Sequence, residues 1–128
     1  SAIIDEAHAL LAQVSLTGMA TRLGGQLSHG EQRSLEVALA LATQPKLLLL
    51  DEPMAGMGSE ESERMVELIE HLAQRVTILL VEHDMDAVFR LADRISDLVG
   101  GTVIASGSPE AIRADAEVRR AYLGDDAT

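Results

Sequence analysis

Two short runs of apolar residues stand out in the hydrophobic pattern and predict buried strands. Leu47 to Leu50 lies between Pro45 and Asp51, and a second run covers residues 76–81. Runs of this length, bounded by turn-forming residues, are typical of strands covered on both faces in a parallel sheet. Helical spacing between the two runs predicts a right-handed crossover, so we expect an α/β fold.

Apolar residues at intervals of three and four predict three longer helices. The first begins at the N-terminal residue without a recognisable cap. The second begins at a capping box formed by Ser28 and Glu31, and the third has Ser59 as its predicted N-cap. Their predicted buried positions are Ile3, Ile4, Ala7, Leu10, Leu11 and Val14, then Leu35, Leu39 and Ala42, and finally Met65, Leu68, Ile69 and Leu72.

Shorter elements are predicted in the last third of the chain. Asp84 is the expected cap of a short helix that carries Val88, Phe89 and Leu91. A hairpin is predicted next, and a last helical stretch follows it. The hairpin joins residues 95–99 to residues 102–105 through two glycines, and the last stretch runs from Ser108-Pro109 to Leu123-Gly124.

Only two strands have the fully apolar pattern, so we expect an incomplete sheet and a chain that is part of a larger domain. We divide the chain into a helical region (1–44), an α/β region (45–94), and a C-terminal hairpin with helices (95–128). A chain of 128 residues corresponds to about one domain at about 100–200 residues per domain.

Composition narrows the possible functions. No cysteine is present, which excludes disulfides, thiolate metal sites and cysteine nucleophiles. The net charge of −11 disfavours nucleic acid and anionic membranes as partners, because both require a cationic face. A small phosphate ligand is compatible with this charge, since local amides and one or two cations hold it. The apolar runs are too short to cross a bilayer and no leader opens the chain, so we expect a soluble, cytoplasmic protein.

Polar residues suited to catalysis or ligand binding follow the two predicted strands and begin one predicted helix. Asp51 and Glu52 end the first strand, and His83 follows the second. The carboxyl ends of parallel strands are where open sheets place ligands. Ser28 and Gly30 lie at a predicted helix N-terminus, where unpaired amides suit a phosphate.

Four segments in fixed order resemble motifs of the ATP-binding cassette (ABC) ATPases. They are residues 27–32, 47–53, 54–59 and 81–84, which resemble the signature motif, the Walker B strand, the D-loop and the switch histidine. The resemblance extends to Ala121 to Gly124 and is nearest to ATPase subunits of branched-chain amino acid importers. It implies the C-terminal portion of an ABC-type P-loop NTPase domain.

The resemblance implies a role for each residue of the signature motif. Ser28 and Gly30 are expected to contact the γ-phosphate of ATP held by the opposite subunit, with His29 and Glu31 completing the nucleotide-binding set. Ser28 and Glu31 also have a purely structural interpretation as a helix cap. His29 replaces the usual glycine, as an additional phosphate donor or as a neutral variant.

The other motifs imply the catalytic set. Asp51 is expected to order the water shell of Mg²⁺, Glu52 to polarise the attacking water, and His83 to hydrogen-bond the γ-phosphate. Gly58 replaces the aspartate common near the end of the D-loop, which puts a carboxylate role there in doubt. Met54 and Met57 are expected to pack rather than to bind ligands.

A Walker A motif is absent, because the only lysine, Lys46, lies between Pro45 and Leu47. We therefore expect the isolated chain to bind ATP weakly or not at all, and to self-associate through uncovered apolar surface. The resemblance implies a second ATPase subunit and transmembrane permease subunits as partners of the parent protein. It places the parent on the inner face of the plasma membrane.

Three alternatives stay open. Lipopolysaccharide-export ATPases resemble the same region. An ABC protein acting on DNA or ribosomes would usually carry a basic surface or long coiled-coil insertions, and neither is visible. A noncatalytic α/β binding module with Asp51 as a receiver-like acid would need further acidic residues near the chain start and a lysine after a late strand.

Overall fold

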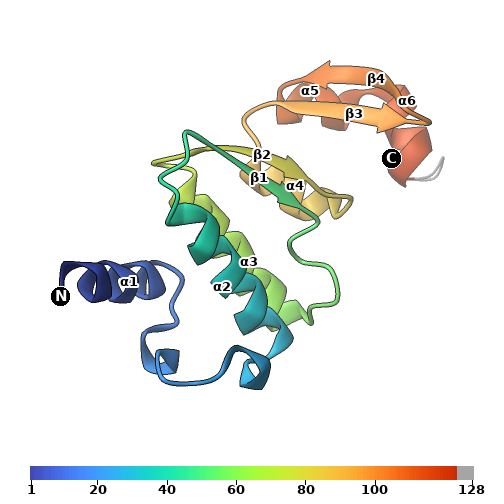
Figure 1. The fold of residues 1–128 in the computed structure, drawn as a ribbon. Helices are drawn as coiled ribbons and strands as arrows, with labels where there is room; N and C mark the ends of the chain where they lie inside the picture. Colours follow the sequence, from blue (N-terminus) through green and yellow to red (C-terminus); the bar gives the residue numbers. More distant parts are fainter. Residues whose placement is uncertain (124–128) are drawn as a thin grey trace. The chain divides into compact units, whose positions relative to one another are not determined.

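The computed structural model describes residues 1–123, which divide into two compact units. The first unit is Ser1–His83 and the second begins at Asp84 (Figure 1). The first unit contains α1 (Ala2–Gln13), η1 (Thr17–Met19), η2 (Gly24–Gln26), α2 (His29–Leu41), β1 (Leu47–Asp51), α3 (Ser59–Leu72) and β2 (Thr77–Val81). The second contains α4 (Met85–Leu91), β3 (Ile95–Val99), β4 (Thr102–Gly107), α5 (Pro109–Ala114), α6 (Ala116–Val118) and a π-helical turn, η3 (Arg119–Leu123).

The first unit contains a parallel two-stranded sheet, β1 with β2. Leu47 pairs with Thr77 and Asp51 pairs with Val81, so both strands end at the same edge. The helix α3 makes the crossover between them, as the order of elements predicts. Figure 1 shows α2 and α3 side by side along one face of this sheet. The predicted α/β architecture with an incomplete sheet is confirmed.

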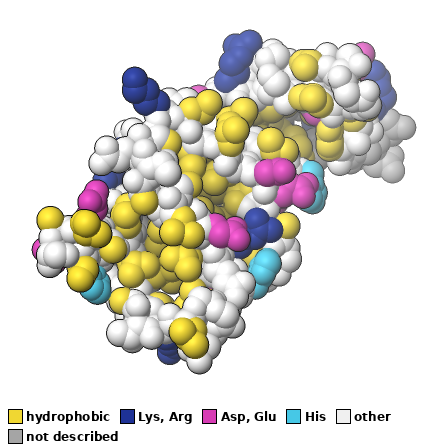
Figure 2. Space-filling view, in the orientation of Figure 1, with side chains coloured by type: hydrophobic (Ala, Val, Ile, Leu, Met, Phe, Trp, Pro, Cys, Tyr) yellow, Lys and Arg dark blue, Asp and Glu magenta, His cyan; other side chains and the backbone are white. Residues whose placement is uncertain are grey.

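The prediction that both strands are buried on both faces is wrong. Leu48 and Leu50 are buried, whereas Leu47 and Leu49 are 52% and 65% exposed. In β2, Leu79 and Val81 are likewise exposed. Side chains alternate along a strand, and α2 with α3 covers only one face. Hydrophobic side chains are therefore visible on the surface of this unit (Figure 2).

The predicted faces of α1 and α2 also need correction. The hydroxyl of Ser1 caps α1 by accepting from the Ile4 amide, and no residue of α1 is buried. Of the predicted positions only Val14, the C-cap that follows the helix, is buried. In α2 the buried residues are Val37, Ala38 and Leu41, in place of the predicted Leu35, Leu39 and Ala42. Residues 37–42 are all apolar, so helical spacing alone permits several stripes and packing selects one.

The start of α3 differs from the prediction by one residue. Gly58 is the N-cap without a side-chain hydrogen bond, and Ser59 is the first helical residue. The predicted apolar stripe is largely confirmed, because Met65, Ile69 and Leu72 are buried; Leu68 is half-buried. Val66 joins the buried set.

The second unit follows its predicted local signals closely. Asp84 caps α4 through the Ala87 amide, and Ser108 caps α5. The strands β3 and β4 form an antiparallel hairpin with positive φ at both connecting glycines, and β4 extends two residues beyond the prediction. Its core contains Ile95, Ile112 and Val118. The predicted helix end at Gly124 lies outside the described residues.

Among residues 1–123, no helix is long and apolar enough to span a membrane.

Candidate functional site

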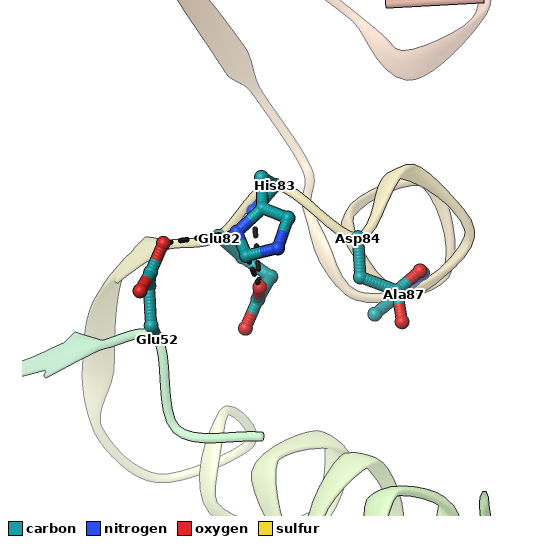
Figure 3. A network of polar contacts seen from close by, with 5 residues as sticks. All are labelled: Glu52, Glu82, His83, Asp84 and Ala87. Carbon is teal, nitrogen blue, oxygen red and sulfur yellow. Dashed lines mark hydrogen bonds and ion pairs between the residues drawn. The ribbon is translucent and has the colours of Figure 1, made fainter. Parts of the chain in front are cut away.

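Glu52 and His83 meet at the edge where β1 and β2 end. Nδ1 of His83 donates to Oε1 of Glu52 over 2.9 Å (Figure 3). The backbone of Glu52 has φ +45°, a left-handed conformation, and its amide donates to the Val81 carbonyl at 2.8 Å. The two side chains are 47% and 74% exposed. Solvent therefore weakens their attraction, but a ligand can reach both.

A second carboxylate, that of Glu82, supports His83 from the buried side. Its Oε1 accepts from the His83 amide at 3.0 Å and lies 3.6 Å from Nδ1 of the ring. The Glu82 side chain is only 3% exposed. Glu82 is not among the residues predicted for the site. Strand alternation was the available signal, because Val81 points outward and the next side chain is expected to turn inward.

Asp51 is the last residue of β1 and is exposed. Its carboxylate is a hard oxygen donor at the ligand-binding edge of the sheet, which fits a Mg²⁺ ion that keeps most of its water ligands. Residues 1–123 contain no cluster of three or more histidine, cysteine, aspartate or glutamate side chains that would enclose a metal by itself. A Mg²⁺ ion at this edge would therefore take most of its ligands from water or a phosphate.

The signature residues form a complete capping box at the start of α2. The Glu31 amide donates to the Ser28 hydroxyl at 3.2 Å, and the Ser28 amide donates to Glu31 Oε1 at 2.8 Å. The hydrogen bonds from the Ser28 amide and hydroxyl lower the pKa of Glu31, and the positive charges of Arg22 and Arg64 add to this effect against partial desolvation. Glu31 is thus committed to the cap as an anion.

His29 points away from the capping box toward the segment that follows β1. Its Nε2 lies 3.1 Å from the carbonyl oxygen of Ala55. Because a carbonyl only accepts, Nε2 must donate. The sequence predicted His29 as either a phosphate donor or a neutral variant, and neither prediction included this backbone partner. No sequence pattern indicates which backbone carbonyl a side chain will reach.

Gly30 borders an open groove of about 1050 Å³. The wall opposite Gly30 is the carboxylate of Glu61, since a Cβ built on Gly30 would lie 3.0 Å from Glu61 Cδ. In this structure the space beside Gly30 is occupied by a carboxylate of α3. The groove is also lined by Ser28, Glu31, Met57 and Arg64.

The predicted site residues form two groups. One contains Ser28, Gly30 and Glu31 at the start of α2, and the other contains Glu52 and His83, with Asp51 beside them at the sheet edge. His29 joins the groups through Ala55, whose amide donates to the Glu52 carbonyl at 3.1 Å. Met54 is buried, as expected of a packing residue.

Comparison with protein families gives two matches along the chain. Residues 2–55 match the family described as ABC transporter, and residues 102–128 match the family described as branched-chain amino acid ATP-binding cassette transporter. The two segments lie at opposite ends of the sequence and agree on the same class of protein.

Curated relatives and solved structures point the same way. The branched-chain amino acid transport ATP-binding protein LivG of Escherichia coli strain K12 is 43% identical over 127 residues, 98% of this chain and 50% of LivG. The lipopolysaccharide export ATP-binding protein LptB of Haemophilus influenzae is 34% identical over 94% of this chain and 51% of LptB. A crystal structure of the ADP conformation of MJ1267, an ATP-binding cassette of an ABC transporter, matches with a TM-score of 0.84 at 28% identity, covering 98% of this chain and 51% of MJ1267. The chain spans about half the length of the relatives it matches.

Proposed function

We propose that this chain, as a member of the family of ABC transporter ATP-binding domains, supplies two parts of an ATPase: the residues that activate water and the signature motif. The observation that carries the proposal is the pairing of Glu52 with His83 at the carboxyl edge of the parallel strands. A carboxylate held by a histidine at such an edge is suited to accept a proton from a water molecule.

In the proposed reaction, Glu52 accepts a proton as the water oxygen bonds to the γ-phosphorus of ATP. The bond from that phosphorus to the bridging oxygen breaks, and its electron pair leaves with ADP. His83 orients the Glu52 carboxylate through Nδ1 and, with a second proton on the ring, donates from Nε2 to a γ-phosphate oxygen. Asp51 would hold Mg²⁺ through its water ligands, and the ion would supply positive charge that neutralises the phosphates.

The signature group acts on the nucleotide of a second subunit. Ser28 and Gly30 present a hydroxyl and a backbone amide at the N-terminus of α2, where the helix dipole favours an anion. Glu31 maintains the geometry of Ser28 through the capping box. For this contact the Glu61 carboxylate must leave the space beside Gly30, which its flexible side chain allows.

The transported solute is proposed from the relatives. LivG, whose name states branched-chain amino acid transport, covers nearly the whole chain at 43% identity, and the branched-chain amino acid ATP-binding cassette transporter family matches residues 102–128. We therefore infer import of branched-chain or related amino acids, powered at the cytoplasmic face through permease subunits. Lipopolysaccharide export is the second candidate, because LptB is 34% identical over 94% of the chain.

The decisive test is Glu52→Gln in the full-length protein that contains this chain, reconstituted with its permease subunits. Loss of a positioned base is expected to lower ATP turnover by about 10²-fold or more while nucleotide binding persists. The control is Glu60→Gln, which removes an exposed carboxylate in the first turn of α3. Unchanged turnover in Glu52→Gln would refute the role of this residue.

Separate expectations apply to the 128-residue chain by itself. Because its sequence lacks a Walker A motif, isothermal titration with MgATP should show no micromolar binding. The open sheet face should drive self-association, measured by light scattering, and Leu49→Lys should reduce it by placing a charge among exposed apolar side chains. A monodisperse wild-type monomer at high concentration would contradict the second expectation.

A further inference from the structure

The side chain of His29 contacts the segment that carries Glu52, although 23 sequence positions separate the two residues. His29 occupies the first position of α2, and its Nε2 donates to the carbonyl of Ala55 over 3.1 Å. Ala55 lies three residues after Glu52, and its amide donates to the Glu52 carbonyl at 3.1 Å. One hydrogen-bonded turn therefore lies between the imidazole of His29 and the backbone of Glu52.

Glu52 needs support from its surroundings because its backbone is in an unfavourable conformation. Its φ of +45° is rarely adopted by a residue with a side chain and persists only where neighbouring contacts maintain it. Two backbone bonds do so directly, one from the Glu52 amide to Val81 and one from Ala55 to the Glu52 carbonyl. The His29 contact holds Ala55 from the other side and so restrains the same turn.

The local geometry suits a histidine ring at position 29. A Cβ built on Gly56 would lie 3.3 Å from His29 Nε2, so the ring packs closely over the α-carbon of this glycine. Gly56 also has a φ of +76°, which a residue with a side chain would adopt only under strain. A carbonyl partner requires only an N–H at Nε2, which the neutral ring provides in one tautomer. The contact therefore needs no positive charge on His29.

We propose that His29 is a positioning residue, which fixes the Glu52–Ala55 turn so that the Glu52 carboxylate meets Nδ1 of His83. The proposal rests on the proposed ATPase function of this edge. In this proposal His29, the third residue of the signature motif, acts within its own chain. Its neighbours Ser28 and Gly30 contact the nucleotide that the opposite subunit holds. His29 touches neither the reacting water nor the phosphate in this role.

The competing possibility is a direct phosphate contact by His29. A phosphate ligand contributes to nucleotide binding, so its loss raises KM, whereas a displaced base lowers kcat at nearly constant KM. Three variants distinguish these cases. His29→Phe keeps a ring without a donor, His29→Gln places an amide donor near the position of Nε2, and His29→Asn has an amide too short to reach Ala55.

Steady-state MgATP hydrolysis by the full-length transporter is the first measurement. His29→Phe should lower kcat by about ten- to a hundredfold, as expected for a displaced catalytic group. KM should stay within about twofold of wild type, and His29→Gln should recover most of the lost kcat. The control is His8→Phe, which changes an exposed histidine on α1 and should behave as wild type. If His29→Phe does not fold, His29→Asn supplies the same comparison.

The second measurement uses the 128-residue chain without nucleotide. Long-range ¹⁵N–¹H NMR spectra of the imidazole rings should show the His83 signals displaced in His29→Phe, restored toward wild type in His29→Gln, and unchanged in His8→Phe. Unchanged His83 signals together with wild-type kcat in His29→Phe would overturn the positioning role. A raised KM with unchanged kcat would also overturn it, in favour of a phosphate ligand.

Glu52→Gln separates this proposal from the function on which it rests. If Glu52→Gln hydrolyses ATP as fast as wild type, the ATPase assignment of this edge fails, whatever His29 variants do. If Glu52→Gln is inactive while His29→Phe keeps wild-type kcat and His83 spectra, only the positioning role fails.

Discussion

Oε1 of Glu52 accepts a hydrogen bond from Nδ1 of His83 over 2.9 Å, across 31 positions of sequence. The pair exists because β1 and β2 are parallel and in register, which brings the residues after Asp51 and Val81 to one edge. Because Nδ1 donates this hydrogen bond, the other ring nitrogen of His83 donates to a phosphate oxygen only when the ring carries a proton on both nitrogens.

Replacement of His83 tests this pair from the histidine side. In the full-length protein, His83→Ala should lower ATP turnover by about 10²-fold, because Glu52 loses its orienting donor and the phosphate loses a contact. His8→Ala is the control, since His8 is exposed on α1. Equal turnover in the two variants would contradict the assigned role of His83.

Glu82 should be required for the position of His83 rather than for proton transfer. Glu82→Gln keeps an oxygen that accepts from the His83 amide and should retain most activity. Glu82→Ala removes that acceptor from a buried position and should lower the free energy of unfolding by about 1–3 kcal/mol. Urea denaturation of both variants measures this difference. A Glu82→Gln variant as unstable as Glu82→Ala would show that the buried charge, not the hydrogen bond, matters.

Neighbouring leucines of β1 should differ sharply in their contribution to stability. Leu48 is buried, so Leu48→Ala should reduce the free energy of unfolding by about 2–5 kcal/mol. Leu49 is 65% exposed, so Leu49→Ala should change it by about 0.5 kcal/mol or less. Thermal and urea unfolding of the two variants in dilute solution, where the chain is monomeric, check this directly. Equal losses would mean that the open face is covered in solution.

The capping box should give the chain a defined pH dependence. The pKa of Glu31 is lowered by hydrogen bonds from Ser28, so its contribution to stability is present above the ordinary glutamate pKa and is lost as pH falls through the lowered value. The loss should begin as pH falls below the ordinary glutamate pKa.

Variants of the same box allow this pH dependence to be measured. Ser28→Ala should cost about 1 kcal/mol at neutral pH through the lost cap. Glu31→Gln should remove the part of the acid-induced loss of unfolding free energy that comes from the Glu31 carboxylate, as measured by urea denaturation at a series of pH values. Glu60→Gln serves as the control, because Glu60 is exposed and outside the box. Identical acid profiles for Glu31→Gln and wild type would contradict the assignment.

Tyr122 should titrate at an unusually high pH. Its hydroxyl donates to the Leu98 carbonyl at 2.7 Å, and partial burial, followed by the nearby Asp97, raises the pKa of this phenol. Because the pKa is raised in the folded state, the neutral phenol stabilises the second unit at pH values below the ordinary tyrosine pKa. This stabilisation is lost as pH rises through the raised pKa.

The sequence contains a single tyrosine, so phenolate absorbance reports on Tyr122 alone. Native protein should titrate above the denatured chain. Asp97→Asn should move the native midpoint back toward that of the denatured chain, because it removes the nearby charge. Coincident native and denatured titration curves would show that the phenol has no such contacts in solution.

Short-range signals account for most of what could be predicted. The capping boxes, the hairpin glycines and the proline at the start of α5 each act within four residues, and the structure confirms the elements they mark. The order of strands and helices also predicted that Glu52 and His83 would lie at one edge. The resemblance to ABC ATPases is confirmed by the family matches and by LivG.

Tertiary packing determined the remainder. The sequence by itself determined where elements begin, which turns form and which strands are parallel, because these depend on hydrogen bonds and periodicities close along the chain. Only the tertiary structure decided which face of α2 is buried, that one face of β1 stays open, and that His29 reaches Ala55. These outcomes depend on partners that are distant in sequence. The local sequence does not indicate which of several neighbouring apolar residues will be buried, or which side chain a backbone carbonyl will contact.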